Sequence, residues 1–184
     1  MVARVTMMTA VLLTALLVQT VVVPTFDVLG WRADVVTLTV VGLALADGPP
    51  TGIRYGFAAG LASDLLSGAT QLVGLSALVL LTVGYAAGLA RRYLGSTPLG
   101  GQFLVAGAAS ALSLGLHGVL GILLDAQQSS GGAILQGMLV VGLYNLVLSP
   151  LVLLPLGTLA RRFPGNPAAG ASATPSYHGR PPRA

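Results

Sequence analysis

Long uninterrupted apolar blocks constrain this chain more than any other feature of its sequence. The 184 residues are 54% hydrophobic and only 8% charged, whereas soluble domains carry about 25% charged residues. So few charges cannot cover the surface of a soluble globule of this size. Apolar blocks of this length are typical of segments that cross a lipid bilayer. The sequence therefore predicts an all-α, polytopic integral membrane protein.

Six apolar segments separated by polar links predict six transmembrane helices. The second segment is short for a crossing, which needs about 20 residues, so it either starts earlier or is sheltered by its neighbours. Pro150 and Pro155 in the last segment predict a kink or a break. The expected spans are residues 6–23, 35–46, 52–66, 73–90, 102–124 and 133–159.

The distribution of arginine predicts the orientation of the helices. All nine basic residues are arginines. If the chain starts inside and crosses six times, the pairs at 91–92 and 161–162 are cytoplasmic together with Arg4 and Arg54, and Arg32 is external, as the positive-inside rule requires. Residues 1–162 are thus expected to form one transmembrane domain. Residues 163–184, rich in Pro, Gly, Ala and Ser, are expected to be a disordered tail that leaves both termini in the cytoplasm.

The charged residues exclude several classes of function. The arginines are scattered at segment ends and form no basic stripe, so we expect no nucleic-acid binding but contact with membrane lipids. The absence of cysteine excludes disulfides and thiol catalysis. No paired acids and no nucleophile with a base are visible. We therefore expect no enzyme activity, no bound metal and no cofactor.

The most informative segment is the expected third span. Helical spacing places Gly56, Gly60 and Asp64 on one face, where two small residues let another helix approach closely. An acid inside an apolar span is a functional candidate, because an unpaired one is costly. Asp64 is either a structural lock, accepting hydrogen bonds from the start of the fourth helix or pairing with Arg32, or a contact to a partner or ligand.

Other intramembrane polar groups have a simpler interpretation. His117 lies in the fifth span among serines and glycines, and residues 144–145 precede Pro150 in the sixth. We expect both to be hydrogen-bonded inside the bundle rather than to carry protons. The spacing Gly84-x-x-x-Gly88 likewise predicts tight packing.

The segment from Gly56 to Asp64 reads G-F-x-x-G-L-x-x-D, and Gly74-x-x-x-Leu78 follows it after Gly68. This pattern resembles the signature of the bacterial rod shape-determining protein MreD family. The resemblance covers residues 6–162. The family's signature falls here on Gly56, Phe57, Gly60, Leu61 and Asp64.

The sequence around the signature is also similar to the family. An aspartate, Asp34, opens the second segment, and residues 47–48 read Asp-Gly before the signature helix. Ala33 departs from the pattern, because the family often has proline at this position.

The resemblance implies a non-enzymatic scaffold in the bacterial cell membrane, within the machinery of peptidoglycan elongation. Its implied partners are an MreC-like bitopic protein and, directly or indirectly, a SEDS glycosyltransferase with a class B penicillin-binding protein. The implied fold is similar to the S-components of energy-coupling-factor transporters. The signature residues would either bind a partner or hold the fold.

Two other functions are compatible with the sequence. A vitamin-binding S-component would need a polar pocket near the outer face with aromatic side chains, but only 5% of the residues are aromatic. An ion-coupled or proton-coupled transporter would use Asp64, yet the sequence shows neither a relay of acids nor an internal repeat.

Overall fold

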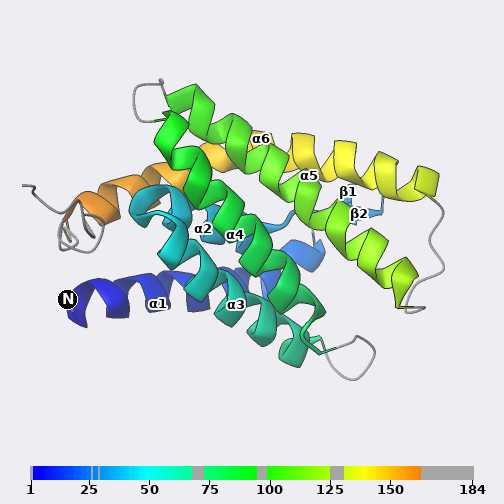
Figure 1. Cartoon of the computed structure of the whole chain (residues 1–184), viewed down its shortest axis with the longest axis horizontal. Helices are drawn as coiled ribbons and strands as arrows, with labels where there is room; N and C mark the ends of the chain where they lie inside the picture. Colours follow the sequence, from blue (N-terminus) through cyan, green and yellow to red (C-terminus); the bar gives the residue numbers. More distant parts are fainter. Residues whose placement is uncertain are drawn as a thin grey trace, which may run out of the picture.

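Six helices follow one another in alternating directions in the computed structural model, which describes residues 2–25, 27–28, 30–67, 73–94, 99–124 and 131–162 (Figure 1). Their bounds are α1 Val2–Leu17, α2 Val35–Asp47, α3 Pro49–Leu66, α4 Leu75–Leu94, α5 Leu99–Leu123 and α6 Gly131–Arg162. A π-helical turn, Val18–Val22, and a 3-10 turn, Val23–Thr25, extend α1. The predicted all-helical class is confirmed. The expected tail, residues 163–184, lies outside the described residues.

Four of the described helical segments are long and apolar enough to cross a bilayer, namely Val2–Val22, Leu75–Leu94, Gly100–Leu123 and Gly131–Ala160. α2 is apolar but has only 13 residues, which gives about 20 Å at 1.5 Å per residue. α3 has 18 residues and carries Arg54 and Asp64. These long apolar segments are those of a membrane protein.

The short helix α2 forms the centre of the bundle. It contacts all five other helices, and every residue from Val36 to Ala44 is buried. A helix that is apolar all round is stable only when other helices surround it. The structure therefore supports one of the two expectations for this segment: it is sheltered by its neighbours and does not begin earlier than Val35.

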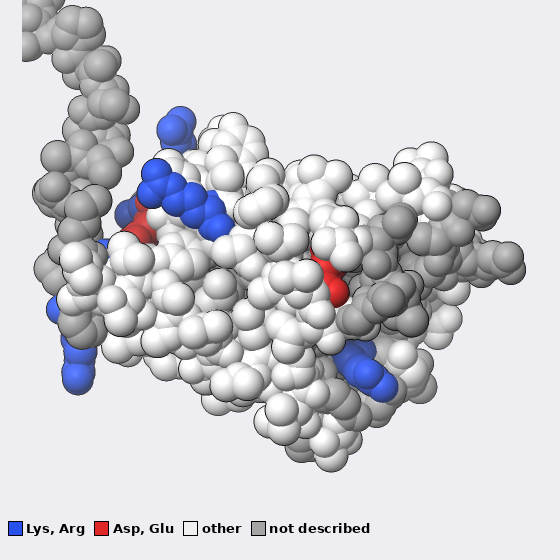
Figure 2. Space-filling model, turned by 90° about the horizontal axis from the view of Figure 1, so that it is seen from below, with Lys and Arg blue, Asp and Glu red and all other residues white. Residues whose placement is uncertain are grey.

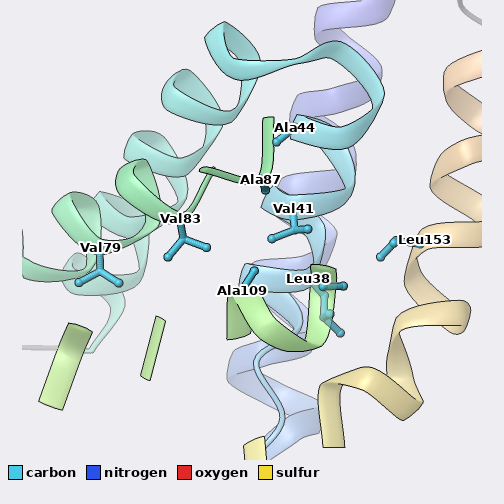
Figure 3. Close-up of a cluster of buried hydrophobic side chains, with 9 residues drawn as sticks. Leu38, Val41, Ala44, Val79, Val83, Ala87, Ala109 and Leu153 are labelled. Atoms are coloured by element: carbon cyan, nitrogen blue, oxygen red, sulfur yellow. The ribbon is translucent and has the colours of Figure 1, made fainter. Parts of the chain in front are cut away.

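The main hydrophobic core lies where α2, α4, α5 and α6 meet (Figure 3). The α2 side chains are at the middle of this cluster, and three α4 side chains cover one side of them. The labelled members are Leu38, Val41 and Ala44 of α2, Val79, Val83 and Ala87 of α4, Ala109 of α5, and Leu153 of α6.

The N-terminal end of α2 is held by amide side chains from two other segments. Asn145 of α6 accepts a hydrogen bond from the backbone N–H of Asp34 (3.1 Å) and donates one to its carbonyl (3.2 Å). Gln19 in the extension of α1 donates to the carbonyl of Ala33 and accepts from the N–H of Val35. Backbone groups left open at a helix start are thereby paired.

A two-stranded hairpin precedes α2, where the sequence analysis expected only a polar link. Strand β1, Asp27–Val28, pairs antiparallel with β2, Trp31–Arg32. Gly30 at the turn has a φ of 79°, a conformation that glycine adopts at little cost. The ring of Trp31 packs on Gly137 of α6, where a Cβ atom would overlap it.

The opposite end of α2 is held by charge. Arg4 of α1 forms an ion pair with Asp47, and its guanidinium also donates to the carbonyl of Ala160 in α6. Both side chains of the pair are largely buried, with 14% and 19% of their surface exposed. Gly48 then turns the chain into α3 with a φ of 93°. One arginine thus joins the ends of α1, α2 and α6.

α6 continues from Gly131 to Arg162 without a break, although Pro150 and Pro155 lie inside it. Pro150 has no N–H to give to the carbonyl of Leu146. The hydroxyl of Ser149 donates to that same carbonyl at 2.7 Å. Replacement of the lost bond by a neighbouring hydroxyl is one way in which membrane helices tolerate proline. Of the two predicted outcomes, a kink or a break, the break does not occur.

The Arg4–Asp47 pair generates a first prediction. Arg4→Ala leaves a largely buried carboxylate without its partner, and we expect the free energy of unfolding in detergent to fall by about 3 kcal/mol. The exchange variant with Arg4→Asp and Asp47→Arg restores opposite charges and is expected to recover part of this loss. Equal stability of Arg4→Ala and the unmodified protein in thermal unfolding would contradict the proposed role of the pair.

Candidate functional site

The glycine face of the signature helix is filled by α4. α3 and α4 run antiparallel and lie side by side (Figure 1). A Cβ atom at Gly52, Gly56 or Gly60 would overlap the backbone of α4. The opposing α4 residues, from the end of the helix to its start, are Gly84, Leu80, and Ser76 with Ala77. The small residues therefore bring two helices of this chain into backbone contact.

Gly84 and Gly88 contribute to the same contact from the side of α4. A Cβ atom at Gly84 would overlap the backbone carbonyl of Gly52, and one at Gly88 would overlap Pro49. The two glycine patterns noted in the sequence therefore face each other. The tight packing expected for Gly84 and Gly88 is the contact that the structure shows.

Asp64 lies near the end of α3, where it binds the start of α4. Its side chain is 1% exposed, and its carboxylate accepts hydrogen bonds from the backbone N–H groups of Gly74 (2.7 Å) and Ser76 (3.2 Å). Gly74 has a φ of 101°, which a side chain would strain. The carboxylate thus pairs N–H groups at the start of α4, which a helix cannot pair by itself.

Further polar groups continue from Ser76 across the bundle. The Ser76 hydroxyl lies 3.1 Å from Nε2 of His117 in α5, and Nδ1 of His117 lies 2.9 Å from the carbonyl of Ser113. A carbonyl can only accept, so Nδ1 carries the proton and, in the neutral ring, Nε2 accepts from Ser76. His117 is hydrogen-bonded inside the bundle, as expected for an intramembrane histidine.

The network ends at the N-terminus of α2. Ser113 Oγ lies 3.4 Å from the hydroxyl of Thr37, which donates to the carboxylate of Asp34. The same carboxylate caps α2 by accepting from the N–H of Thr37 at 2.8 Å. Asp64 enters this network only through backbone N–H groups. These contacts join α3, α4, α5 and α2.

The other two signature residues point elsewhere. Phe57 is 48% exposed, and Leu61 is half-buried one turn further along the same helix. The signature therefore divides between two faces of α3. Gly56, Gly60 and Asp64 face α4, while the Phe57 side chain lies on the outer surface of the bundle.

The charged residues are distributed unevenly along the bundle. One end of the bundle carries Arg4, Arg91, Arg92 and Arg162 and is called the arginine end here. At this end α1 and α3 begin, and α2, α4 and α6 finish. Figure 2 shows basic side chains gathered at one end of the molecule and another basic side chain toward the opposite end.

The polar groups of the site connect helices to one another. Within the described ranges there is no group of three or more side chains suited to a metal ion. The groups in contact are backbone amides, hydroxyls, one imidazole and carboxylates that accept hydrogen bonds. Such an arrangement positions helices against one another.

Fold and site together define an all-helical membrane protein organised around a closely packed helical hairpin with a buried acid. The chain matches the family model of the rod shape-determining protein MreD over residues 1–159. Because this match covers most of the chain, the protein belongs to the MreD family. No curated protein and no solved structure was found to match the chain at a significant level.

Family membership carries a general statement of function. The family determines rod shape in cells, so the chain has a role in rod-shape determination, as a membrane protein that works with other proteins. The family is one of structural membrane proteins and not a known family of enzymes.

Sequence analysis missed several residues that fix the helices. Gln19, Asn145 and the Arg4–Asp47 pair were not assigned contacts, although amide and charged side chains in apolar segments are rare and normally have partners.

The two faces of α3 generate a second prediction. Asp64→Ala leaves the N–H groups of Gly74 and Ser76 buried and unpaired, so we expect the free energy of unfolding to fall by about 2 kcal/mol. Phe57→Ala changes only an outer side chain and should cost less than about 0.5 kcal/mol. Unfolding of both variants in one detergent tests this difference. Similar losses would show that the two residues do not belong to different faces.

Proposed function

We propose that the protein is a non-enzymatic scaffold of the bacterial rod complex, which binds an MreC-like bitopic protein in the cell membrane and thereby supports a SEDS glycosyltransferase and a class B penicillin-binding protein. The observation that carries this proposal is the division of the signature. Its small and acidic residues join α3 to α4, whereas about half of the Phe57 surface, 48%, is exposed on the outside of the bundle.

The surroundings of Phe57 support a role in contacting another helix. Ile53 and Leu65 are also exposed on α3, one turn before and two turns after Phe57, so they continue the same apolar face. The extensive contacts of α3 are those with α4, α2 and α1. This leaves one side of α3 open along its length to lipid or to a single-span partner helix.

The proposal includes six crossings and two cytoplasmic termini, in an arrangement similar to S-components. Its support is the position of the turn between α2 and α3. Asp47 at this turn pairs with Arg4, and Gly48 lies beside the guanidinium of Arg91. α2 and α3 therefore connect the same two ends of the bundle as α1 and α4, and the positive-inside rule places the arginine end in the cytoplasm.

Single cysteines can test this topology, because the natural chain has none. In intact cells treated with a membrane-impermeant maleimide, we expect Ser67→Cys to be labelled and Tyr93→Cys to be protected. Pro50→Cys is the decisive position. It should be protected if α2 and α3 cross the membrane, and labelling of Pro50→Cys would show that they enter and leave on the outer side.

Affinity purification in mild detergent tests the proposed function. Mass spectrometry of the bound material is expected to find a single-span protein and cell-wall synthases, without a stoichiometric metabolite. Phe57→Ala should reduce recovery of the single-span protein about tenfold, as for an aromatic residue central to an interface. Leu139→Ala removes an exposed side chain from α6 and serves as the matched control.

Two results would contradict the proposal. Recovery of a stoichiometric vitamin together with an energising ATPase would identify an S-component. Equal recovery of the partner by Phe57→Ala, Leu139→Ala and the unmodified protein would exclude the outer face of α3 as the contact.

A further inference from the structure

A cavity of about 540 Å³ lies at the arginine end, between α2, α4, α5 and α6. Its polar lining includes the side chains of Arg4 and Arg91 with Gln102 in the first turn of α5. Its apolar lining includes Phe103 and Leu153. The cavity therefore combines guanidinium groups with a hydrocarbon wall.

The charges in this cavity are not balanced by the residues that line it. No aspartate lines the cavity, and within the described part of the chain Arg91 takes part in no ion pair. Arg4 is committed to Asp47 and to the Ala160 carbonyl. Arg91 is thus the cation with donors available to a ligand.

The position of the cavity fits a lipid headgroup. Candidate membrane segments begin or finish at the arginine end with Val2, Leu94, Gly100 and Ala160, so this end lies at the level where headgroups meet acyl chains. Arginine pairs with phosphate through two parallel hydrogen bonds, and basic pockets between membrane helices accommodate such headgroups.

Residues 163–184 follow α6 in the sequence and contain no aspartate and no glutamate. Their two arginines carry the same sign of charge as Arg91. The side chains of this segment therefore offer no complementary charge to the cavity.

We propose that this cavity binds one anionic phospholipid. Its phosphate contacts Arg91 and Gln102, and an acyl chain lies along Phe103 and Leu153. The proposal is independent of the contact at Phe57, since α3 contributes no residue to the cavity.

Native mass spectrometry of the full chain in mild detergent can test this proposal. The probes are phosphatidylglycerol, phosphatidylcholine with the same acyl chains, and inorganic phosphate. We expect retention of one phosphatidylglycerol and an increase of about fivefold or more in its apparent Kd in Arg91→Gln. Arg92→Gln removes the same charge from a residue that does not line the cavity and should change the Kd less than about twofold.

A second pair of variants tests the shape of the cavity without altering charge. A Cβ atom at Gly157, which lines the cavity, would meet no other atom within 4 Å, so Gly157→Leu is the variant chosen to add volume there. We expect it to displace the lipid. Gly132→Leu, equally free at its Cβ on the same helix but at the opposite end, should not.

Three results would overturn the proposal. Equal weakening by Arg91→Gln and Arg92→Gln would show general attraction to the arginine end. Equal retention of phosphatidylcholine, or displacement of the lipid by millimolar phosphate, would exclude an anionic lipid as the specific ligand. Unchanged binding in both Arg91→Gln and Gly157→Leu would exclude the cavity.

Discussion

The backbone contact between α3 and α4 is the interaction on which the rest of the bundle depends. Gly56 and Gly60 allow the helices to touch, but such a contact places the start of α4 in apolar surroundings, where open N–H groups are costly. The carboxylate of Asp64 pairs two of these groups. Small residues and a buried acid are therefore two parts of one solution, which explains why they occur four residues apart on one helical face.

The same requirement governs the central helix α2. Its middle is surrounded by protein, and its ends are paired by side chains from distant segments. Gln19 and Asn145 bind the backbone at one end, and Arg4 binds Asp47 at the other. Among the described residues, no buried side-chain nitrogen or oxygen lacks a hydrogen-bond partner. The polar groups thus set the positions of helices that apolar packing alone would allow to slide.

Much of this architecture could be predicted from the sequence, because lipid imposes simple patterns. Apolar blocks and their breakers gave the helices to within a few residues, and the spacing of Gly56, Gly60 and Asp64 gave the face that is buried. Which helix packs on that face could only be proposed, because the pattern within α3 does not specify that its neighbour is α4. The pairing of Asn145 with Asp34 spans 111 residues, and no local pattern contains such a contact.

Local contacts decide two features that the sequence left open. Of the kink or break predicted for α6, the break does not occur, because the Ser149 hydroxyl replaces the bond that Pro150 removes. The link before α2 contains a short hairpin, because Gly30 permits the turn and the Trp31 ring packs against Gly137, which has no side chain. In both cases a single neighbouring residue decides the outcome, and its effect depends on geometry rather than on composition.

The central claim is that one face of the signature holds the fold and the other meets a partner. The most direct test is photocrosslinking in native membranes, with a photoreactive amino acid placed at Phe57 or at Ala59, which is fully buried. We expect position 57 to yield a product larger than the chain by the mass of a single-span protein, and position 59 to yield only links within the chain. A partner captured at position 59, or none captured at position 57, would contradict the account.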